Sequence, residues 1–340
     1  MRNVQIGILG CGYWGPNFVR NFNQINGCSV KYACDLSRER LLHMKNLYPQ
    51  IMVTRDYKKV LRDNEITAVI VATSATKHFI IAKEALLSGK HVLVEKPITT
   101  DLGEAQELID IAKRKNLKLM VGHTFKFNPG VRKLKALLDA SSLGKVFYIY
   151  SRRTNLGPLR KDVNAMWDLA PHDISIMNYL LGGNPLAAQA QGERYLAHNL
   201  EDVSFITLFY PSKVLAHIHV GWLDPKKNRE IVIVGSKRMA IFDDLDAKNP
   251  VTVYDKRVMK KIFKQEYESF REFQMIIKNG KAVVPKVKQA EPLKLECEHF
   301  IDCIRRNKKP FTDGRDGLEV LRVLKAIDKS LNQGNTKVKI

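Results

Sequence analysis

VQIGILGCGYWGPNF, residues 4–18, organises the first third of this 340-residue chain. The run VQIGIL is typical of a short buried strand, and Gly10-x-Gly12-x-x-Gly15 follows it and opens a helical pattern. Gly10 allows a tight turn, Gly12 lets the backbone approach a pyrophosphate, and Gly15 permits close packing of helix on strand. The start of the helix offers free N–H groups to phosphate oxygens. The stretch therefore predicts a dinucleotide-binding turn.

A glycine triplet alone also fits an ordinary strand-to-helix turn, so the neighbouring residues decide between the two interpretations. Asp35 ends the apolar run 30–34 and lies 20 residues beyond Gly15. A carboxylate at that position accepts hydrogen bonds from the ribose hydroxyls of adenosine. We therefore predict NAD as the cofactor, with Tyr13 and Trp14 of the turn also beside it.

The composition indicates a globular protein with two domains. Hydrophobic residues make up 45% of the chain and charged residues 27%, and no apolar window reaches the length of a membrane span. The first strand begins within a few residues of the N-terminus, which leaves no room for a secretory signal. The 5 cysteines lack the paired spacing of metal sites. These patterns predict reduced thiols, no metal site, no membrane contact and a cytoplasmic location.

The net charge of +21 raises the question of nucleic-acid binding. The excess of lysine and arginine is spread along the chain, with one local concentration at 256–288. That stretch carries no nucleic-acid recognition motif, so a solvated basic face is favoured over a nucleic-acid footprint. We predict no nucleic-acid partner, and expect the positive field to favour anionic small substrates.

Strand and helix patterns alternate through the first third, as in a parallel, doubly wound sheet. The buried strand at 67–72 ends at the edge where such sheets bind ligands. Thr73, Ala75 and His78 follow it and are expected to approach the cofactor. For His78, a surface position at the start of the next helix is an equally open interpretation.

The next strand, 91–94, runs directly into Glu95-Lys96-Pro97. A lysine at this end of a parallel strand can donate to a ribose hydroxyl and to a substrate oxygen, while Glu95 offsets its charge. We predict that both side chains contact the cofactor and that Lys96 also takes part in chemistry. The strand at 118–122 is expected to close the nucleotide domain.

Four segments together resemble the family of glucose-fructose oxidoreductase, inositol dehydrogenase and rhizopine-catabolism proteins. These segments are GILGCGYWG, ACD, VATSATKHFIIAKEALLSGKHVLVEKP and GHTFKFNP. The resemblance implies an α/β plus α+β fold, with a Rossmann domain at 1–122 and an open antiparallel-sheet domain at 123–340. It implies a homodimer or homotetramer formed through that sheet, and Lys96 as an active-site residue. The family often has arginine where Lys126 stands, so Lys126 is predicted only as a substrate contact.

The second half also carries its own patterns. Strands are expected at 146–152, 188–195, 203–210, 214–220 and 230–234, with a turn at 211–213 and a terminal amphipathic helix at 317–331. A helix starting near Pro292 carries Cys297 and Cys303, whose spacing of six residues does not align them on one face. Core packing is therefore favoured over a metal site for these cysteines.

Asp168 and His172 are four residues apart in a helix expected to begin near Trp167. A neutral histidine can accept a proton from a sugar hydroxyl while hydride leaves the same carbon, and Asp168 can orient the imidazole or polarise the substrate. Taken alone, such a pair is more often a helix cap and a structural histidine. The resemblance favours catalysis, because Asp168-Leu-Ala-Pro-His172 matches the family's Asp-x-x-x-His pattern, with Ala170 in place of the usual glycine.

The loop before this helix indicates the substrate. Its cations and amides suit a diphosphate and sugar hydroxyls, although a solvated loop with incidental basic residues is the alternative. The residues concerned are Arg152, Arg153, Asn155, Arg160, Lys161 and Asn164, with Trp167 beside them.

The segment RTNLGPLRKDVNAMWDLAPHD is similar to the branch of the family that acts on nucleotide-linked sugars. The leading hypothesis is an NAD-dependent dehydrogenase that oxidises a nucleotide sugar, at C3 of UDP-N-acetylglucosamine or a UDP-N-acetylglucosaminuronate, and feeds amino-sugar biosynthesis. The alternatives are an inositol, polyol or free-sugar dehydrogenase, and a non-catalytic nucleotide-sensing regulator.

Overall fold

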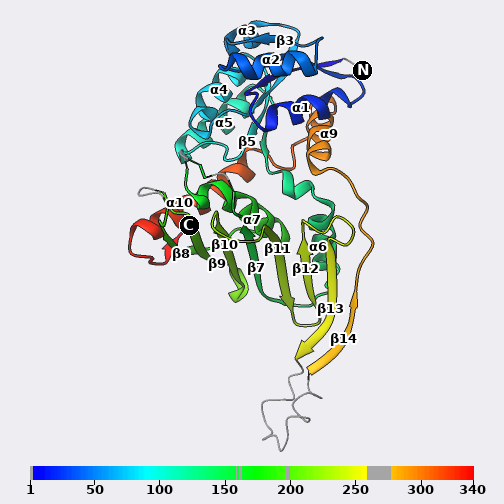
Figure 1. Ribbon diagram of the computed structural model, residues 1–340, viewed down its shortest axis with the longest axis vertical. Helices are drawn as coiled ribbons and strands as arrows, with labels where there is room; N and C mark the ends of the chain where they lie inside the picture. Colours follow the sequence, from blue (N-terminus) through cyan, green and yellow to red (C-terminus); the bar gives the residue numbers. More distant parts are fainter. Residues whose placement is uncertain (1–2, 158, 161–162, 197–199, 259–276) are drawn as a thin grey trace, which may run out of the picture. The chain divides into compact units, whose positions relative to one another are not determined.

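The computed structural model describes residues 3–157, 159–160, 163–196, 200–258 and 277–340 (Figure 1). The chain forms two compact units. The first, the nucleotide unit, comprises Met1–Phe127 and Ala290–Arg322, and the second, the sheet unit, comprises Asn128–Gln289 and Val323–Ile340. Among the described residues, no helix is long and apolar enough to cross a membrane.

The nucleotide unit is built on sheet A, which has six parallel strands in the order β3-β2-β1-β4-β5-β6. The strands are β1 (Val4–Leu9), β2 (Cys28–Cys34), β3 (Met52–Thr54), β4 (Ile66–Val71), β5 (His91–Glu95) and β6 (Leu119–Gly122). This order reverses direction between β1 and β4, and ligands of open α/β sheets bind at that reversal. The predicted Rossmann architecture is confirmed.

Helices connect these strands, and three of them begin at a side-chain cap. The connecting helices are α1 (Trp14–Asn23), α2 (Arg38–Leu47), α3 (Tyr57–Arg62), α4 (Ala75–Leu87) and α5 (Leu102–Arg114). The side chains of Ser37, Asp56 and Asp101 accept hydrogen bonds from N–H groups in the first turns of α2, α3 and α5.

A distant segment completes the nucleotide unit, so its composition differs from the expected 1–122. This segment, 290–322, contains α9 (Pro292–Arg305). The short helix η1 (Thr124–Phe127) follows β6 and also lies beyond residue 122. Four apolar residues of α9 belong to the hydrophobic core that also holds residues of β1 and α1: Leu293, Cys297, Phe300 and Ile301. Burial of these side chains keeps 290–322 out of the sheet unit.

The sheet unit is built on sheet B, in the order β14-β13-β12-β11-β7-β10-β9-β8-β15. Its strands are β7 (Val146–Thr154), β8 (Ala187–Glu193), β9 (Val203–Phe209), β10 (Leu215–Gly221), β11 (Asn228–Gly235), β12 (Met239–Asp243), β13 (Val251–Val258), β14 (Ile277–Val283) and β15 (Val338–Lys339). Its paired strands are antiparallel except β7 and β10, which run parallel. The sheet is therefore mixed, where an antiparallel one was expected.

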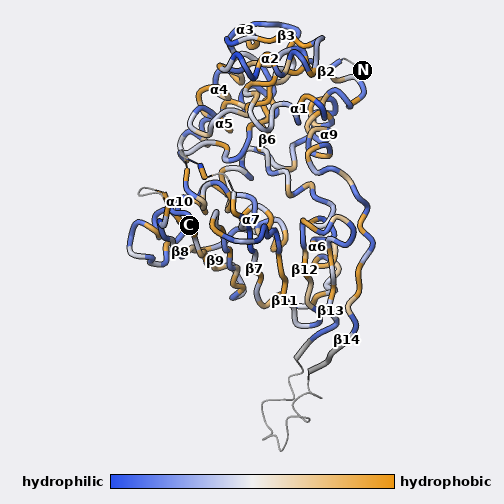
Figure 2. Tube along the Cα trace, in the orientation of Figure 1, coloured by the Kyte–Doolittle hydropathy of each residue, from blue (hydrophilic) through white to orange (hydrophobic). Residues whose placement is uncertain are grey.

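One face of sheet B is packed by helices. Helices α6 (Pro129–Asp139) and α7 (Ala165–Leu181) belong to this unit, as does α10 (Gly314–Asn332) from Val323 onward, and η2 (Pro211–Lys213) forms the predicted turn between β9 and β10. Contacts join α7 to β7, β9 and β10, and α6 to β12 and β13. Along β9 and β10 buried residues alternate with partly or fully exposed ones. Figure 2 shows hydrophobic and hydrophilic residues interspersed along the strands of this sheet.

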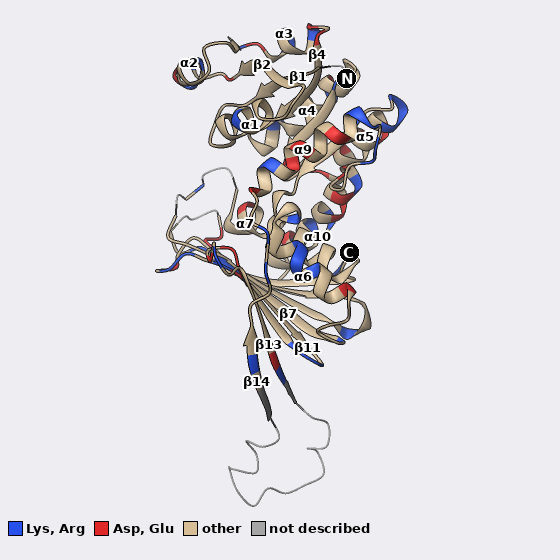
Figure 3. Cartoon of the chain, turned by 90° about the vertical axis from the view of Figure 1, so that its right-hand side faces the viewer, with Lys and Arg blue, Asp and Glu red and all other residues tan. Residues whose placement is uncertain are grey.

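Lysine and arginine occur on both units, as Figure 3 shows. The basic stretch noted at 256–288 runs through 259–276, which lies outside the described residues.

Candidate functional site

The glycine turn after β1 has the geometry that a dinucleotide requires. Gly10 has φ +103°, and a Cβ there would overlap the carbonyl of Ala72. A Cβ on Gly15 would lie 2.7 Å from the carbonyl oxygen of Gly10. At Gly12 the nearest atom to such a Cβ is a guanidinium nitrogen of Arg40, 3.9 Å away, so the backbone there is open to a ligand. The turn therefore fits a bound pyrophosphate.

The start of α1 is also available to an anion. Tyr13 occupies the N-cap position, and within the described chain no side chain caps the helix. Tyr13 is 81% exposed and its ring meets Trp14 edge to face, with 5.2 Å between the centroids. The first N–H groups of α1 can therefore donate to phosphate oxygens.

Asp35 ties the end of β2 to the glycine turn. Its carboxylate accepts hydrogen bonds from the backbone N–H groups of Cys11, at 2.7 Å, and Ser37, at 2.8 Å. The guanidinium of Arg40 lies 3.5 Å from the same carboxylate. Asp35 stands where a ribose hydroxyl is expected, with an exposed cation beside it.

We expect NADH to bind more tightly than NADPH, because Asp35 repels a 2′-phosphate, and we expect Arg40 to reduce the difference. Arg40→Ala should weaken NADPH binding by about tenfold more than NADH binding, the value of one charge-assisted hydrogen bond. Fluorescence titration with both cofactors measures this, and Arg38→Ala on the same helix is the comparison. Tighter binding of NADPH by wild type would show that Asp35 does not face the ribose.

His78 is buried at the ligand-binding edge of sheet A. The alternative interpretation, a surface position for His78, is therefore wrong. Its Nδ1 lies 2.7 Å from the carbonyl oxygen of Pro97, and its Nε2 lies 3.1 Å from that of Thr73. The ring therefore links the loops that follow β4 and β5. Thr73 is partly exposed, while Ala75 is buried in the first turn of α4. Contacts of these three residues with the cofactor stay predictions.

Lys96 follows the last residue of β5 and is partly exposed. Its backbone N–H donates to Oε2 of Glu95 at 3.2 Å, and the peptide bond between Lys96 and Pro97 is cis. Burial raises the pKa of Glu95 to about 7, and the charge of Lys96 acts against this increase. Glu95 thus balances the charge of Lys96 from inside the protein.

Lys126 is buried, which does not support its predicted contact with substrate. Its ammonium pairs with one oxygen of Asp316, and Nδ1 of His123 lies 2.8 Å from the other. Burial opposes ionisation of Asp316, but His123 and Lys126 outweigh it and hold the carboxyl pKa below its usual value. Lys126 also lies over the ring of Phe311, 4.5 Å from its centroid. These contacts attach 290–322 to the rest of the nucleotide unit.

In the sheet unit, α7 begins at Ala165, two residues before the predicted start. The reason is Asn164, whose Oδ1 caps the helix by accepting the N–H of Trp167 at 2.9 Å. The amide of Asn164 donates to Glu201 at 2.6 Å, so this buried side chain has a structural role, and its contact with substrate stays a prediction. Pro171 consequently falls in the second turn, not the first.

Asp168 and His172 lie one turn apart on α7 and both are partly exposed. One oxygen of Asp168 is 3.2 Å from the guanidinium of Arg160, and the other accepts from the indole N–H of Trp222 at 3.3 Å. Two donors therefore hold the carboxylate in place. Sequence reasoning missed Trp222, because its partner is 54 residues away.

Arg153 is buried against α7, contrary to its predicted place at the substrate entrance. Its guanidinium makes two hydrogen bonds to Asp173, at 2.7 and 3.3 Å. Trp167 is partly exposed, and its indole N–H lies 3.4 Å from a carboxylate oxygen of Asp328 on α10. Asn155 is partly exposed in the loop after β7, while Lys161 lies outside the described residues. Among the loop cations that the structure describes, Arg160 lies beside Asp168.

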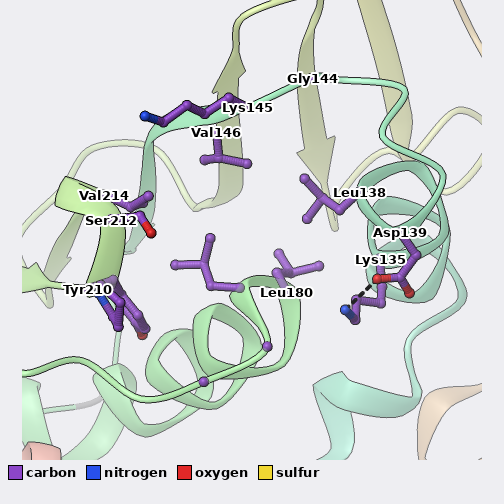
Figure 4. Close-up of a pocket in the computed structure, with 14 residues that line it drawn as sticks. Lys135, Leu138, Asp139, Gly144, Lys145, Val146, Leu180, Tyr210, Ser212 and Val214 are labelled. Carbon is purple, nitrogen blue, oxygen red and sulfur yellow. Dashed lines mark hydrogen bonds and ion pairs between the residues drawn. The ribbon is translucent and has the colours of Figure 1, made fainter.

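A separate cavity of about 500 Å³ lies at the other end of α7 (Figure 4). Leu138, Val146 and Leu180 point into it, with Lys135 and Asp139 paired at its edge. Leu180 is eight residues beyond His172, about 12 Å along the helix. This cavity is therefore not where the candidate catalytic residues act.

Comparison with known proteins agrees with this geometry. Residues 4–123 match the oxidoreductase family with an NAD-binding Rossmann fold, and residues 131–241 match the GFO/IDH/MocA C-terminal domain. The chain belongs to the Gfo/Idh/MocA oxidoreductase family. It is accordingly an NAD-dependent oxidoreductase with a dehydrogenase architecture, as the glycine turn predicts.

Three similar proteins illustrate the range of the family. The uncharacterized oxidoreductase YrbE of Bacillus subtilis is 24% identical over 98% of this chain and 96% of its own. Inositol 2-dehydrogenase of Salmonella typhimurium is 28% identical over 52% of this chain and 54% of its own. The structure of UDP-N-acetylglucosamine 3-dehydrogenase GnnA from Acidithiobacillus ferrooxidans has a TM-score of 0.82 at 21% identity, covering 97% of this chain and 98% of that one.

Proposed function

We propose that the chain oxidises a secondary hydroxyl of a nucleotide-linked sugar, at C3 of a UDP-N-acetylhexosamine or its uronate. The observation that carries the proposal is the pairing of Arg160 with Asp168 in a partly exposed position. A carboxylate can accept sugar hydroxyls, and an arginine beside it can bind a diphosphate or carboxylate oxygen. An uncharged polyol needs no such cation. A ketone at C3 is suited to later transamination, which supports a role for the reaction in amino-sugar synthesis.

Each side chain has a distinct task in this reaction. NAD, held by the glycine turn, supplies the acceptor for the hydride. His172 accepts the hydroxyl proton in its neutral form. Asp168, held by Trp222 and Arg160, fixes the orientation of the sugar. The ammonium of Lys96 stabilises the negative charge that develops on the substrate oxygen.

Incubation with a panel of UDP-sugars, myo-inositol and free sugars, followed by NADH absorbance, tests the substrate class. We expect reduction of NAD with a UDP-N-acetylhexosamine or its uronate. Arg160→Ala should raise the KM for that substrate by about tenfold, the value of one charge-assisted contact. Turnover of inositol or a free sugar alone would replace the proposal by the polyol alternative. Nucleotide binding without any turnover would favour a regulator.

We further propose a homodimer or homotetramer formed through the open face of sheet B, in the cytoplasm. Four exposed apolar side chains on neighbouring strands support an interface: Tyr148, Tyr150, Phe205 and Leu215. All the cysteines are free and buried, as expected in a reducing compartment. Light scattering in solution measures the assembly, and a monomer would contradict this part of the proposal.

A further inference from the structure

Two buried carboxyl groups lie in the nucleotide unit behind Lys96. Glu95 is the last residue of β5, and Glu296 lies on α9 with 0% of its surface exposed. A carboxylate is costly in a dry interior unless a cation or hydrogen-bond donors compensate for its lost hydration. The mechanism above gives no task to Glu296.

The carboxyl group of Glu95 lies flat against β6. Glu95 is paired with Gly122 of β6 in the sheet. A Cβ on Gly122 would lie 3.1 Å from Oε2 of Glu95 and 3.2 Å from its Oε1. Glycine at this position therefore leaves the space that the carboxyl occupies. The backbone N–H of Lys96 donates to Oε2, so Glu95 has both a donor and a cation beside it.

Glu296 faces the same stretch of chain. Its Oε2 accepts a hydrogen bond from the hydroxyl of Thr124 at 2.7 Å, two residues beyond Gly122. Its Oε1 is buried and has no hydrogen-bond partner among the residues that the structure describes. Burial and then the charge of Glu95 raise the pKa of Glu296 well above the usual value. Only one hydroxyl therefore compensates for the burial of this group.

Two carboxyl groups that repel each other in a dry region do not both ionise. Lys96 and its N–H stabilise a charge on Glu95, whereas Glu296 has one neutral donor. The neighbouring thiol of Cys297 is affected by Glu296 itself and, among the described residues, by Cys28, Glu95 and Glu291, whose carboxylate is paired with Arg20. None of these brings an unpaired cation to Glu296, so the proton remains there.

We propose that, of these two buried carboxyl groups, Glu296 keeps its proton, and the single negative charge on Glu95 holds Lys96 as an ammonium. Glu296 is thus a positioning residue that acts through Glu95. The inference rests on the proposed role of Lys96, but the proton on Glu296 can be tested without cofactor or substrate.

The first test is the pH dependence of unfolding by urea in the cofactor-free protein. Native wild type keeps a proton that the unfolded chain releases above the ordinary glutamate pKa. The stabilisation that this protonated group gives is complete at acid pH and declines as pH rises. The equilibrium constant for unfolding therefore increases by about tenfold per pH unit. Glu296→Gln removes this decline. Between pH 5 and 8, the unfolding constant of wild type should therefore rise at least about tenfold relative to that of Glu296→Gln.

Glu298→Gln is the matched control, because Glu298 lies on the same helix and is exposed. This variant should follow wild type across the range. Parallel curves for wild type and Glu296→Gln would overturn the proposal, since Glu296 would then be ionised in the native state or have an ordinary pKa.

A second measurement uses the wild type and does not require a variant to fold. Infrared spectroscopy at neutral pH should show the carbonyl band of a buried carboxylic acid, and a folded Glu296→Gln variant should lack it. Absence of that band from wild type contradicts a protonated Glu296.

The third measurement separates a role in catalysis from a merely structural one. In Glu95→Gln, Lys96 loses the negative charge of Glu95, so the alkaline limb of single-turnover hydride transfer should move at least about one pH unit lower. In Glu296→Gln that limb should not move lower, because the charge stays on Glu95. Equal displacement in both variants would overturn the assignment of the charge, whereas a substrate other than a nucleotide sugar would leave all three results intact.

Discussion

Lys96→Met is expected to lower turnover by at least about a hundredfold, or roughly 2.7 kcal/mol of transition-state stabilisation. Methionine has nearly the length of lysine but no charge, so the negative oxygen formed as the hydroxyl proton leaves loses its cation. The glycine turn and the start of α1 do not include Lys96, and binding of NADH should therefore change by only a few-fold.

Two measurements together test this expectation: single-turnover hydride transfer and fluorescence titration with NADH. Lys77→Met is the control, because Lys77 is an exposed lysine in the first turns of α4. It should match wild type in both measurements. Near-normal turnover of Lys96→Met would remove Lys96 from the active site.

His172→Asn is expected to remove the rising limb of the pH profile for oxidation. A histidine that acts as base must be neutral, so hydride transfer should increase with pH through its apparent pKa. Asparagine keeps some hydrogen bonding but cannot accept the proton as an equivalent base. Turnover should therefore fall by about a hundredfold, while binding of the nucleotide sugar falls much less.

The measurement is single-turnover hydride transfer against pH, because slow product release would hide the limb in steady-state rates. His43→Asn, at an exposed position of α2, serves as the comparison and should retain the wild-type profile. If His172→Asn shows the same rise as wild type, another group is the base and His172 packs beside the site.

The strand and helix order of the nucleotide unit follows from local sequence. Apolar runs such as VQIGIL and TAVIVA are short and end at turn residues, so their positions are visible without any distant information. The glycine turn is equally local, because Gly10 and Gly15 are needed for backbone contacts within one strand-turn-helix unit. These parts of the fold and site are predictable.

The environments of individual charged side chains are not predictable in this way. Lys126 and Arg153 lie in segments that suit a substrate entrance, yet each is buried against a carboxylate far along the chain, Asp316 and Asp173. Asparagine is a common N-cap residue, and the cap that Asn164 forms makes α7 begin two residues earlier than predicted. Each outcome depends on pairing in three dimensions, which local patterns do not encode.

The return of α9 to the nucleotide unit has a consequence for biosynthesis. Residues 1–127 leave the ribosome long before Leu293, Cys297, Phe300 and Ile301 are made. During that interval the apolar surfaces that α9 later covers are exposed, and the nascent chain cannot finish its first core. Chaperones that bind such surfaces should remain on the emerging chain until translation passes residue 322.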